Sequence, residues 1–173
     1  MAAPFSDWLY TLYRSKGILV DTNLMVLLVV GTYEIQRISS FKRTRQYTVE
    51  DFALMMRVLA LFERRITTPH ILTEVDNLTR QLPESEHNAI SETLTHLVST
   101  LFEVHEPAAA IMRMDLYPDL GLTDCVTVSL ARDLLVITDD YRLSNILSAA
   151  GRDALNINHI RDLANIPGLR RRT

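Results

Sequence analysis

Short apolar runs alternate with longer stretches of helical periodicity along most of this chain. Continuous apolar runs at residues 17–20, 134–138 and 154–157 predict buried strands, residues 102–104 predict another, and a brief strand opens the segment 65–82. Because helical segments separate these strands, the pattern predicts βαβ units and a parallel sheet covered on both faces.

Helical periodicity fills the intervals between the predicted strands. An amphipathic helix is expected within residues 4–13, and a buried helix follows at 23–33, ending near Gly31. Thr68 as N-cap and Pro69 at the first helical position predict a helix start in the segment 65–82. Further helices are expected at residues 48–64, 84–101, 122–133, 140–151 and 159–165, whereas the basic segment 36–47 breaks the pattern.

Composition indicates one globular domain over residues 1–173, with residues 1–16 as an N-terminal helical extension and 170–173 as a frayed basic tail. A chain of 173 residues, 47% hydrophobic and 23% charged, is long enough to bury a real core. The longest apolar run, residues 24–30, is too short to span a bilayer, and no secretory signal is recognisable. The single cysteine, Cys125, fits a reducing compartment. We therefore expect a cytoplasmic protein without a membrane segment.

Acidic residues stand where the predicted strands end. Asp21 follows the run at 17–20, and the pair Asp139 and Asp140 follows the run at 134–138. Parallel strands would bring these positions to one edge of the sheet, where ligands gather. Glu74 lies on the border of an apolar helix stripe, and Asp124 lies near the start of a helix that reads as buried. We expect all four positions to be half-buried.

Each acid alone has an ordinary structural explanation, but the combination favours a site. Asp21 and the Asp139–Asp140 pair could be helix caps, Glu74 a solvated helix edge, and Asp124 a first-turn acid favoured by the helix dipole. Brought together, the carboxylates would raise each other's pKa values unless a cation held them. Oxygen ligands select Mg²⁺ or Mn²⁺, and such a site suits phosphodiester hydrolysis.

Four segments in order resemble the PIN (PilT N-terminal) domain nucleases: "ILVDTNLMV", "TTPHILTEVDNL", "GLTDCVTVSLA" and "LLVITDDYRLSN". The resemblance implies a three-layer α/β/α fold with a central, mostly parallel sheet and a Mg²⁺- or Mn²⁺-dependent endoribonuclease site. By motif it makes Asp21, Glu74 and Asp124 metal-binding, catalytic acids. The fourth acid falls on Asp140, with Asp139 as the alternative. The supporting residues would be Thr22, Asn23 and Thr138.

The basic segment and the chain's role carry further expectations. Lys42, Arg43 and Arg45 could hold an RNA backbone, with Phe41 and Tyr47 stacking on a base; a solvated connection between helices is the alternative. A toxin or phage-defence ribonuclease is the preferred role, which allows an antitoxin or regulatory partner. The alternative is a non-catalytic PIN-like module in an RNA-bound assembly.

Other catalytic classes fit the sequence less well. A haloacid-dehalogenase-type phosphatase needs a second Asp two residues after the first, and Asn23 stands there. The histidines show no metalloprotease or zinc spacing, and Gly-rich phosphate loops and nucleophile elbows are missing. The carboxylates near Cys125 argue against a reactive thiolate.

The apolar helices around Trp8 and at residues 49–62 predict a homodimer through a self-association surface. Light scattering at high protein concentration tests this expectation. A mass that stays monomeric over the whole concentration range would contradict it.

Overall fold

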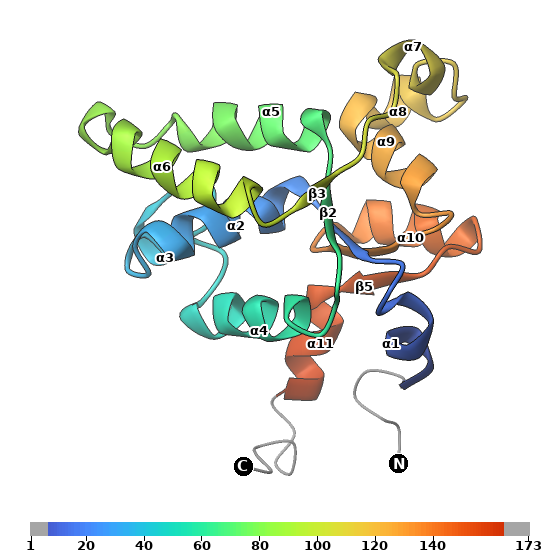
Figure 1. Cartoon of the computed structure of the whole chain (residues 1–173), viewed down its shortest axis with the longest axis horizontal. Coiled ribbons are helices and arrows are strands. Elements are labelled where there is room, and N and C mark those ends of the chain that lie inside the picture. The colour runs from blue at the N-terminus through green and yellow to red at the C-terminus, as the bar shows by residue number, and fades with distance from the viewer. Residues whose placement is uncertain (1–6, 165–173) are drawn as a thin grey trace.

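Five parallel strands form the centre of the fold (Figure 1). The computed structural model describes residues 7–164, and side chains within residues 9–161. The spatial order of the strands is β3-β2-β1-β4-β5. Their bounds are β1 (Ile18–Val20), β2 (Arg65–Thr67), β3 (Phe102–Glu103), β4 (Leu135–Thr138) and β5 (Ala154–Asn156). The predicted α/β class with a parallel central sheet is confirmed.

The register of β1 and β4 sets where the chain leaves the sheet. Val20 is paired with Ile137, and the backbone N–H of Asp21 donates to the Ile137 carbonyl at 3.0 Å. On the other side of β4, Thr138 is paired with Asn156. The segments that follow β1, β4 and β5 therefore begin at one edge of the sheet, as predicted for the first two.

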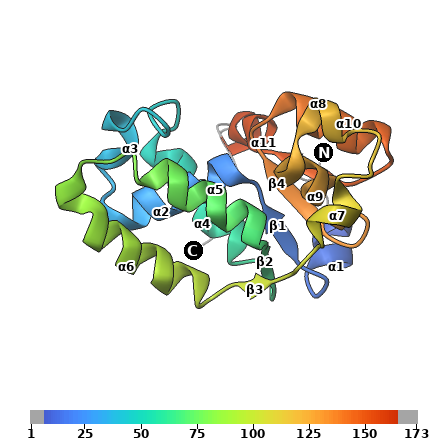
Figure 2. The same cartoon turned by 90° about the horizontal axis from the view of Figure 1, so that it is seen from above.

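Helix α2 (Thr22–Tyr33) is the central helix of the fold. Residues 24–31 are all buried, because the helix packs against α3, α4, α5 and α6 as well as against β4. Figure 2 shows α2, α5 and α6 on one side of the strands, with α9 and α10 on the other. A helix enclosed on all sides needs the apolar sequence that follows Asp21.

The remaining helices begin where the sequence offers caps. The Thr68 hydroxyl accepts from the Ile71 N–H at 3.2 Å, with Pro69 at the first position of α5, as predicted. The bounds are α1 (Asp7–Tyr13), α3 (Arg37–Ser40), α4 (Val49–Leu59), α5 (Pro69–Thr79), the 3₁₀ helix η1 (Glu84–Glu86), α6 (His87–Val98), α7 (Ala108–Ile111), α8 (Tyr117–Leu120), α9 (Leu122–Leu130), α10 (Tyr141–Ala149) and α11 (Ile157–Ala164).

Several predicted boundaries are wrong for identifiable reasons. The helix predicted at 48–64 ends at Leu59, because residues 60–64 turn to lead into β2. Segment 36–47 contains the short helix α3, and α7 and α8 were not predicted, since four residues are too few to show a helical period. Helix α11 begins at Ile157, where the Asn156 side chain accepts from the Asn158 N–H at 3.0 Å.

Some sequence expectations fall outside what the structure describes or stay open. The basic tail at 170–173, residues 1–6 and the Trp8 side chain lie outside the described part. Val49, Met56 and Leu61 are exposed apolar side chains in and after α4, and the self-association surface stays a prediction. Among the described residues, no helix is both long enough and apolar enough to cross a membrane.

Replacing Gly31 with alanine is expected to destabilise the protein. A Cβ atom at this position would lie 2.5 Å from Cδ2 of the Phe52 ring, so the ring or α4 would have to shift. We expect Gly31→Ala to lower the free energy of unfolding by about 1–3 kcal/mol in denaturant titrations, although alanine is the better helix former. The loss should shrink in a Phe52→Leu background. A stabilised Gly31→Ala variant would contradict the close packing.

Candidate functional site

Asp21 is buried at the point where β1 meets α2. It is only 5% exposed, and both of its carboxylate oxygens accept hydrogen bonds. Oδ1 accepts from the Thr22 N–H at 2.7 Å, which makes Asp21 the N-cap of α2, and Oδ2 accepts from the Thr138 hydroxyl at 2.6 Å. Asp21 is therefore both a helix cap and one of the acids at this edge of the sheet.

Burial raises the pKa of Asp21 to about 7, and the negative charges of Asp124 and Asp139 add to the increase. The hydrogen bonds from Thr138 and Thr22 act in the opposite direction, because they stabilise the charged carboxylate. The two charges that act most strongly on Asp21 are both negative. Acids from three distant parts of the chain therefore meet at this edge of the sheet.

Glu74 is held between two helices by threonine hydroxyls. Oε2 accepts from Thr22 in α2 at 3.1 Å, and Oε1 accepts from Thr123 in α9 at 2.8 Å. The expectation that Glu74 is half-buried is wrong, because the residue is exposed on α5. Its carboxylate is nevertheless fixed, and each donor neighbours a candidate acid in sequence, Asp21 or Asp124.

Asp124 lies in the first turn of α9 and is partly buried. Burial raises the pKa of Asp124 to about 6, the charges of Asp140 and Glu74 raise it further, and the charge of Arg142 lowers it. Asp124 thus interacts with Asp21, Glu74 and Asp140. Its charge therefore interacts with acids from three other segments of the chain.

Asp139 and Asp140, which follow β4, have different hydrogen-bond partners. Asp140 is the N-cap of α10, where its Oδ1 accepts from the N–H groups of Arg142 and Leu143 at 2.6 and 3.1 Å. The backbone N–H of Asp140 donates to the Thr138 hydroxyl at 3.0 Å. Thr138 therefore connects Asp21 to Asp140. The motif implied only that Thr138 supports the site.

Asp139 accepts three side-chain hydrogen bonds. Oδ1 accepts from Asn23 at 3.3 Å, and Oδ2 accepts from Tyr47 at 2.6 Å and from Gln46 at 3.3 Å. Burial and the charge of Asp139 raise the pKa of Tyr47, so its hydroxyl stays a donor. Asn23, which the motif placed in support of Asp21, contacts Asp139 instead.

The donors at this edge have the chemistry of a hard-metal site, but they are not assembled into one. The candidate ligands are all carboxylate oxygens whose charges repel, which is the donor set that Mg²⁺ and Mn²⁺ prefer. Within residues 7–164, no three His, Cys, Asp or Glu side chains are arranged so that they could hold a metal ion. Mg²⁺ or Mn²⁺ binding therefore stays a prediction that the residue chemistry fits.

Of the two expectations for the basic segment, binding of an RNA backbone stays a prediction and base stacking is wrong. Lys42, Arg43 and Arg45 are exposed, and Arg43 donates to the Gln81 side chain at 3.0 Å. The expectation that Phe41 and Tyr47 stack on a base is wrong, because they are only 6% and 3% exposed. The cations directly precede Gln46 and Tyr47, which contact Asp139.

Several residues of the site were not assigned these roles from the sequence. Thr123 holds Glu74, Tyr47 and Gln46 hold Asp139, and Arg142 acts on Asp124. Thr123 and Arg142 stand inside the quoted motifs, one residue before and two residues after a candidate acid, and this adjacency was the available signal. Tyr47 lies far from Asp139 in sequence, and no pattern linked the two.

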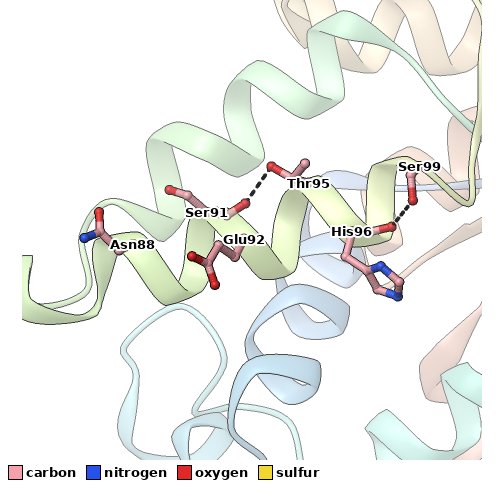
Figure 3. A pocket seen from close by; sticks show the side chains of 6 residues that line it. All are labelled: Asn88, Ser91, Glu92, Thr95, His96 and Ser99. Atoms are coloured by element: carbon pink, nitrogen blue, oxygen red, sulfur yellow. Dashed lines mark hydrogen bonds between the residues drawn. The ribbon is translucent and has the colours of Figure 1, made fainter.

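Two other features carry no evident chemistry. Burial raises the pKa of Cys125, with a further increase from Asp124, as expected for a core thiol. Figure 3 shows a hollow along one face of α6, where Thr95 and Ser99 donate to backbone carbonyls of their own helix. None of the candidate acids lines this hollow; its residues are Asn88, Ser91, Glu92, Thr95, His96 and Ser99.

Comparison of the chain with protein-family models gives no match. Comparison with curated proteins gives none either, and the same holds for solved structures. The resemblance to PIN domain nucleases therefore rests on the four quoted motifs and stays a prediction.

Asp21→Asn is expected to stabilise the metal-free protein at pH 8 and to change its stability little at pH 4. The native pKa of about 7 exceeds the ordinary value of 3.8, so the native state holds its proton more tightly and loses stability as pH rises from about 4 to 7. The shift corresponds to about 4 kcal/mol at pH 8. Because asparagine carries no charge but weakens the two hydrogen bonds of Asp21, we expect a net gain of roughly 2 kcal/mol.

Denaturant titrations in EDTA at both pH values measure this effect, with Asp76→Asn on the outer side of α5 as the control. A variant that is less stable than wild type at pH 8 would show that the lost hydrogen bonds outweigh the relieved charge.

Proposed function

We propose that this protein is a metal-dependent endoribonuclease that hydrolyses RNA phosphodiester bonds at the carboxyl edge of its sheet. The candidate catalytic acids are Asp21, Glu74, Asp124 and Asp140, and the metal would be Mg²⁺ or Mn²⁺. The observation that carries the proposal is the meeting of acids from four segments at one edge, where burial, together with the charges of neighbouring acids, raises the pKa of Asp21 to about 7 and of Asp124 to about 6. Perturbed carboxylates gathered at one sheet edge are typical of functional sites.

The repulsion has a direct chemical meaning. Separate helix caps or surface acids would not need to share one edge, whereas here the charges of neighbouring acids add to the raised pKa values of Asp21 and Asp124, at a cost in stability. A divalent cation bound among them would remove that cost. The same cation would activate water and neutralise charge on the phosphate during hydrolysis.

The chain's own residues would orient the acids and the substrate. The hydroxyl of Thr138 and the Thr22 N–H fix the Asp21 carboxylate, and Thr22 with Thr123 fix that of Glu74. Helices α2 and α10 begin at this edge, and α9 carries Asp124 in its first turn, so their N-terminal dipoles favour negative groups. An RNA phosphate would meet a favourable field there once a cation balances the acids.

The choice of RNA as substrate follows from the motif resemblance, and the basic segment supports it. Lys42, Arg43 and Arg45 are exposed and adjoin the residues that contact Asp139, so a phosphate backbone could run from them to the acids. Arg142, which acts on Asp124, adds a cation beside the acids. A toxin or defence role, with an antitoxin or regulatory partner, belongs to the same proposal.

Substitution of either central acid is expected to abolish cleavage. The protein should cut single-stranded RNA in Mn²⁺ and stop in EDTA, and Asp21→Asn or Asp124→Asn should reduce product to background. Gel analysis of a labelled oligonucleotide measures this, with Asp76→Asn as the matched control that keeps activity. The variants should remain folded by circular dichroism, since like-charge repulsion is relieved.

Two outcomes would contradict the proposal. Cleavage that survives both substitutions, or that ignores EDTA, would exclude the acidic site as its source. RNA binding by wild type without cleavage in either metal would favour the non-catalytic module.

A further inference from the structure

We infer that Tyr47 is a positioning residue for the proposed metal site, because its hydroxyl fixes one oxygen of Asp139 and leaves the other facing Asn23. The inference rests on the proposed function, since it assigns Tyr47 a part in organising that site. Tyr47 lies outside the four motifs that carry the family resemblance. The motifs therefore assign it no role.

The two carboxylate oxygens of Asp139 differ in the number and length of the hydrogen bonds that they accept. Oδ2 accepts from Tyr47 at 2.6 Å, a short distance typical of a charge-assisted bond, and from Gln46 at 3.3 Å. Oδ1 accepts only a long bond, 3.3 Å, from Asn23 in the first turn of α2. Asn23 follows Asp21 by two residues, so this second oxygen faces the segment that carries Asp21, and one long hydrogen bond leaves it acceptor capacity for another partner.

Tyr47 is itself held in place by neighbouring side chains. Its side chain is buried at 3% exposure, and the guanidinium of Arg161 lies 5.8 Å from the centre of its ring. Arg161 binds both carboxylate oxygens of Asp51, at 2.5 and 2.7 Å. Asp51 is in turn part of the capping box of α4, where it bonds reciprocally with Thr48. The ring of Tyr47 therefore has little freedom to turn away.

The same arrangement also holds the backbone of Asp139. Arg161 donates to the Asn158 side chain at 2.7 Å, and Asn158 donates to the Asp139 carbonyl at 3.1 Å. Asp139 is thus held at its side chain through Tyr47 and at its main chain through α11. A network that fixes one carboxylate from both ends is what an oriented metal ligand or its neighbour requires.

Mn²⁺ binding by Tyr47→Phe tests this positioning role. Phenylalanine keeps the buried ring and removes only the hydroxyl, so Asp139 loses its shortest hydrogen bond while the packing stays. We expect the dissociation constant for Mn²⁺, measured from free Mn²⁺ by electron paramagnetic resonance without RNA, to rise about tenfold.

The chain offers a closely matched control in Tyr13→Phe. Tyr13 is also buried, and its hydroxyl donates to Oδ2 of Asp153 at 2.8 Å. Tyr13 precedes β1 and Asp153 precedes β5, so this pair lies at the opposite edge of the sheet. The control should lose stability as Tyr47→Phe does but bind Mn²⁺ like wild type.

A double-mutant cycle with Asp139→Asn shows whether Tyr47 acts through Asp139. The effect of Tyr47→Phe on Mn²⁺ binding should disappear in the Asp139→Asn background. If Tyr47→Phe does not fold, Gln46→Ala, which removes an exposed donor to the same oxygen, should weaken Mn²⁺ binding about twofold, and only when Asp139 is present.

The outcomes separate this inference from the proposed function. Wild-type Mn²⁺ affinity in Tyr47→Phe, an equal loss in Tyr13→Phe, or an undiminished effect with Asp139→Asn would overturn the positioning role alone. If Tyr47→Phe does not fold, unchanged binding by Gln46→Ala would do the same. Failure of wild type to bind Mn²⁺, or equal binding by Asp21→Asn, would overturn both.

Discussion

The buried carboxylate of Asp21 is the constraint on which the rest of the edge depends. It caps α2, the helix enclosed by the core, and through Thr138 it is tied to the end of β4. Because α2 packs against α4, α5 and α6, its start cannot shift without disturbing the core. The position of Asp21 is therefore set by a helix that the core encloses, and the other acids are arranged around it.

Threonines next to the acids do much of this arranging. Thr22 follows Asp21 but holds Glu74, Thr123 precedes Asp124 and also holds Glu74, and Thr138 connects Asp21 with Asp140. Each hydroxyl thus links its own segment to an acid from another. Such links fix carboxylates that repel each other, which explains how raised pKa values and ordered side chains occur together at this edge.

The segment 36–48 and helix α11 contribute a second layer of support on the side of Asp139. Tyr47 bonds the side chain of Asp139, and Asn158 of α11 bonds its backbone carbonyl. Asp51 in α4 joins the two parts, because it accepts from the Thr48 N–H and from Arg161 of α11. A partly buried ion pair such as Asp51–Arg161 is costly to break, since either charge alone would be left unpaired. The basic residues at 42–45 consequently belong to a segment whose end, at Gln46 and Tyr47, is held by Asp139.

The sequence by itself determined the strands, the central buried helix, the cap at Thr68 and the meeting of Asp21 with the acids after β4, since these follow from local periodicity and parallel pairing. It misjudged the exposure of Glu74 and the rings of Phe41 and Tyr47, because burial depends on neighbours far along the chain. Only the tertiary structure decided which hydroxyl holds which acid. The Tyr47–Asp139 bond joins residues 92 positions apart, and local patterns carry no information about such a contact.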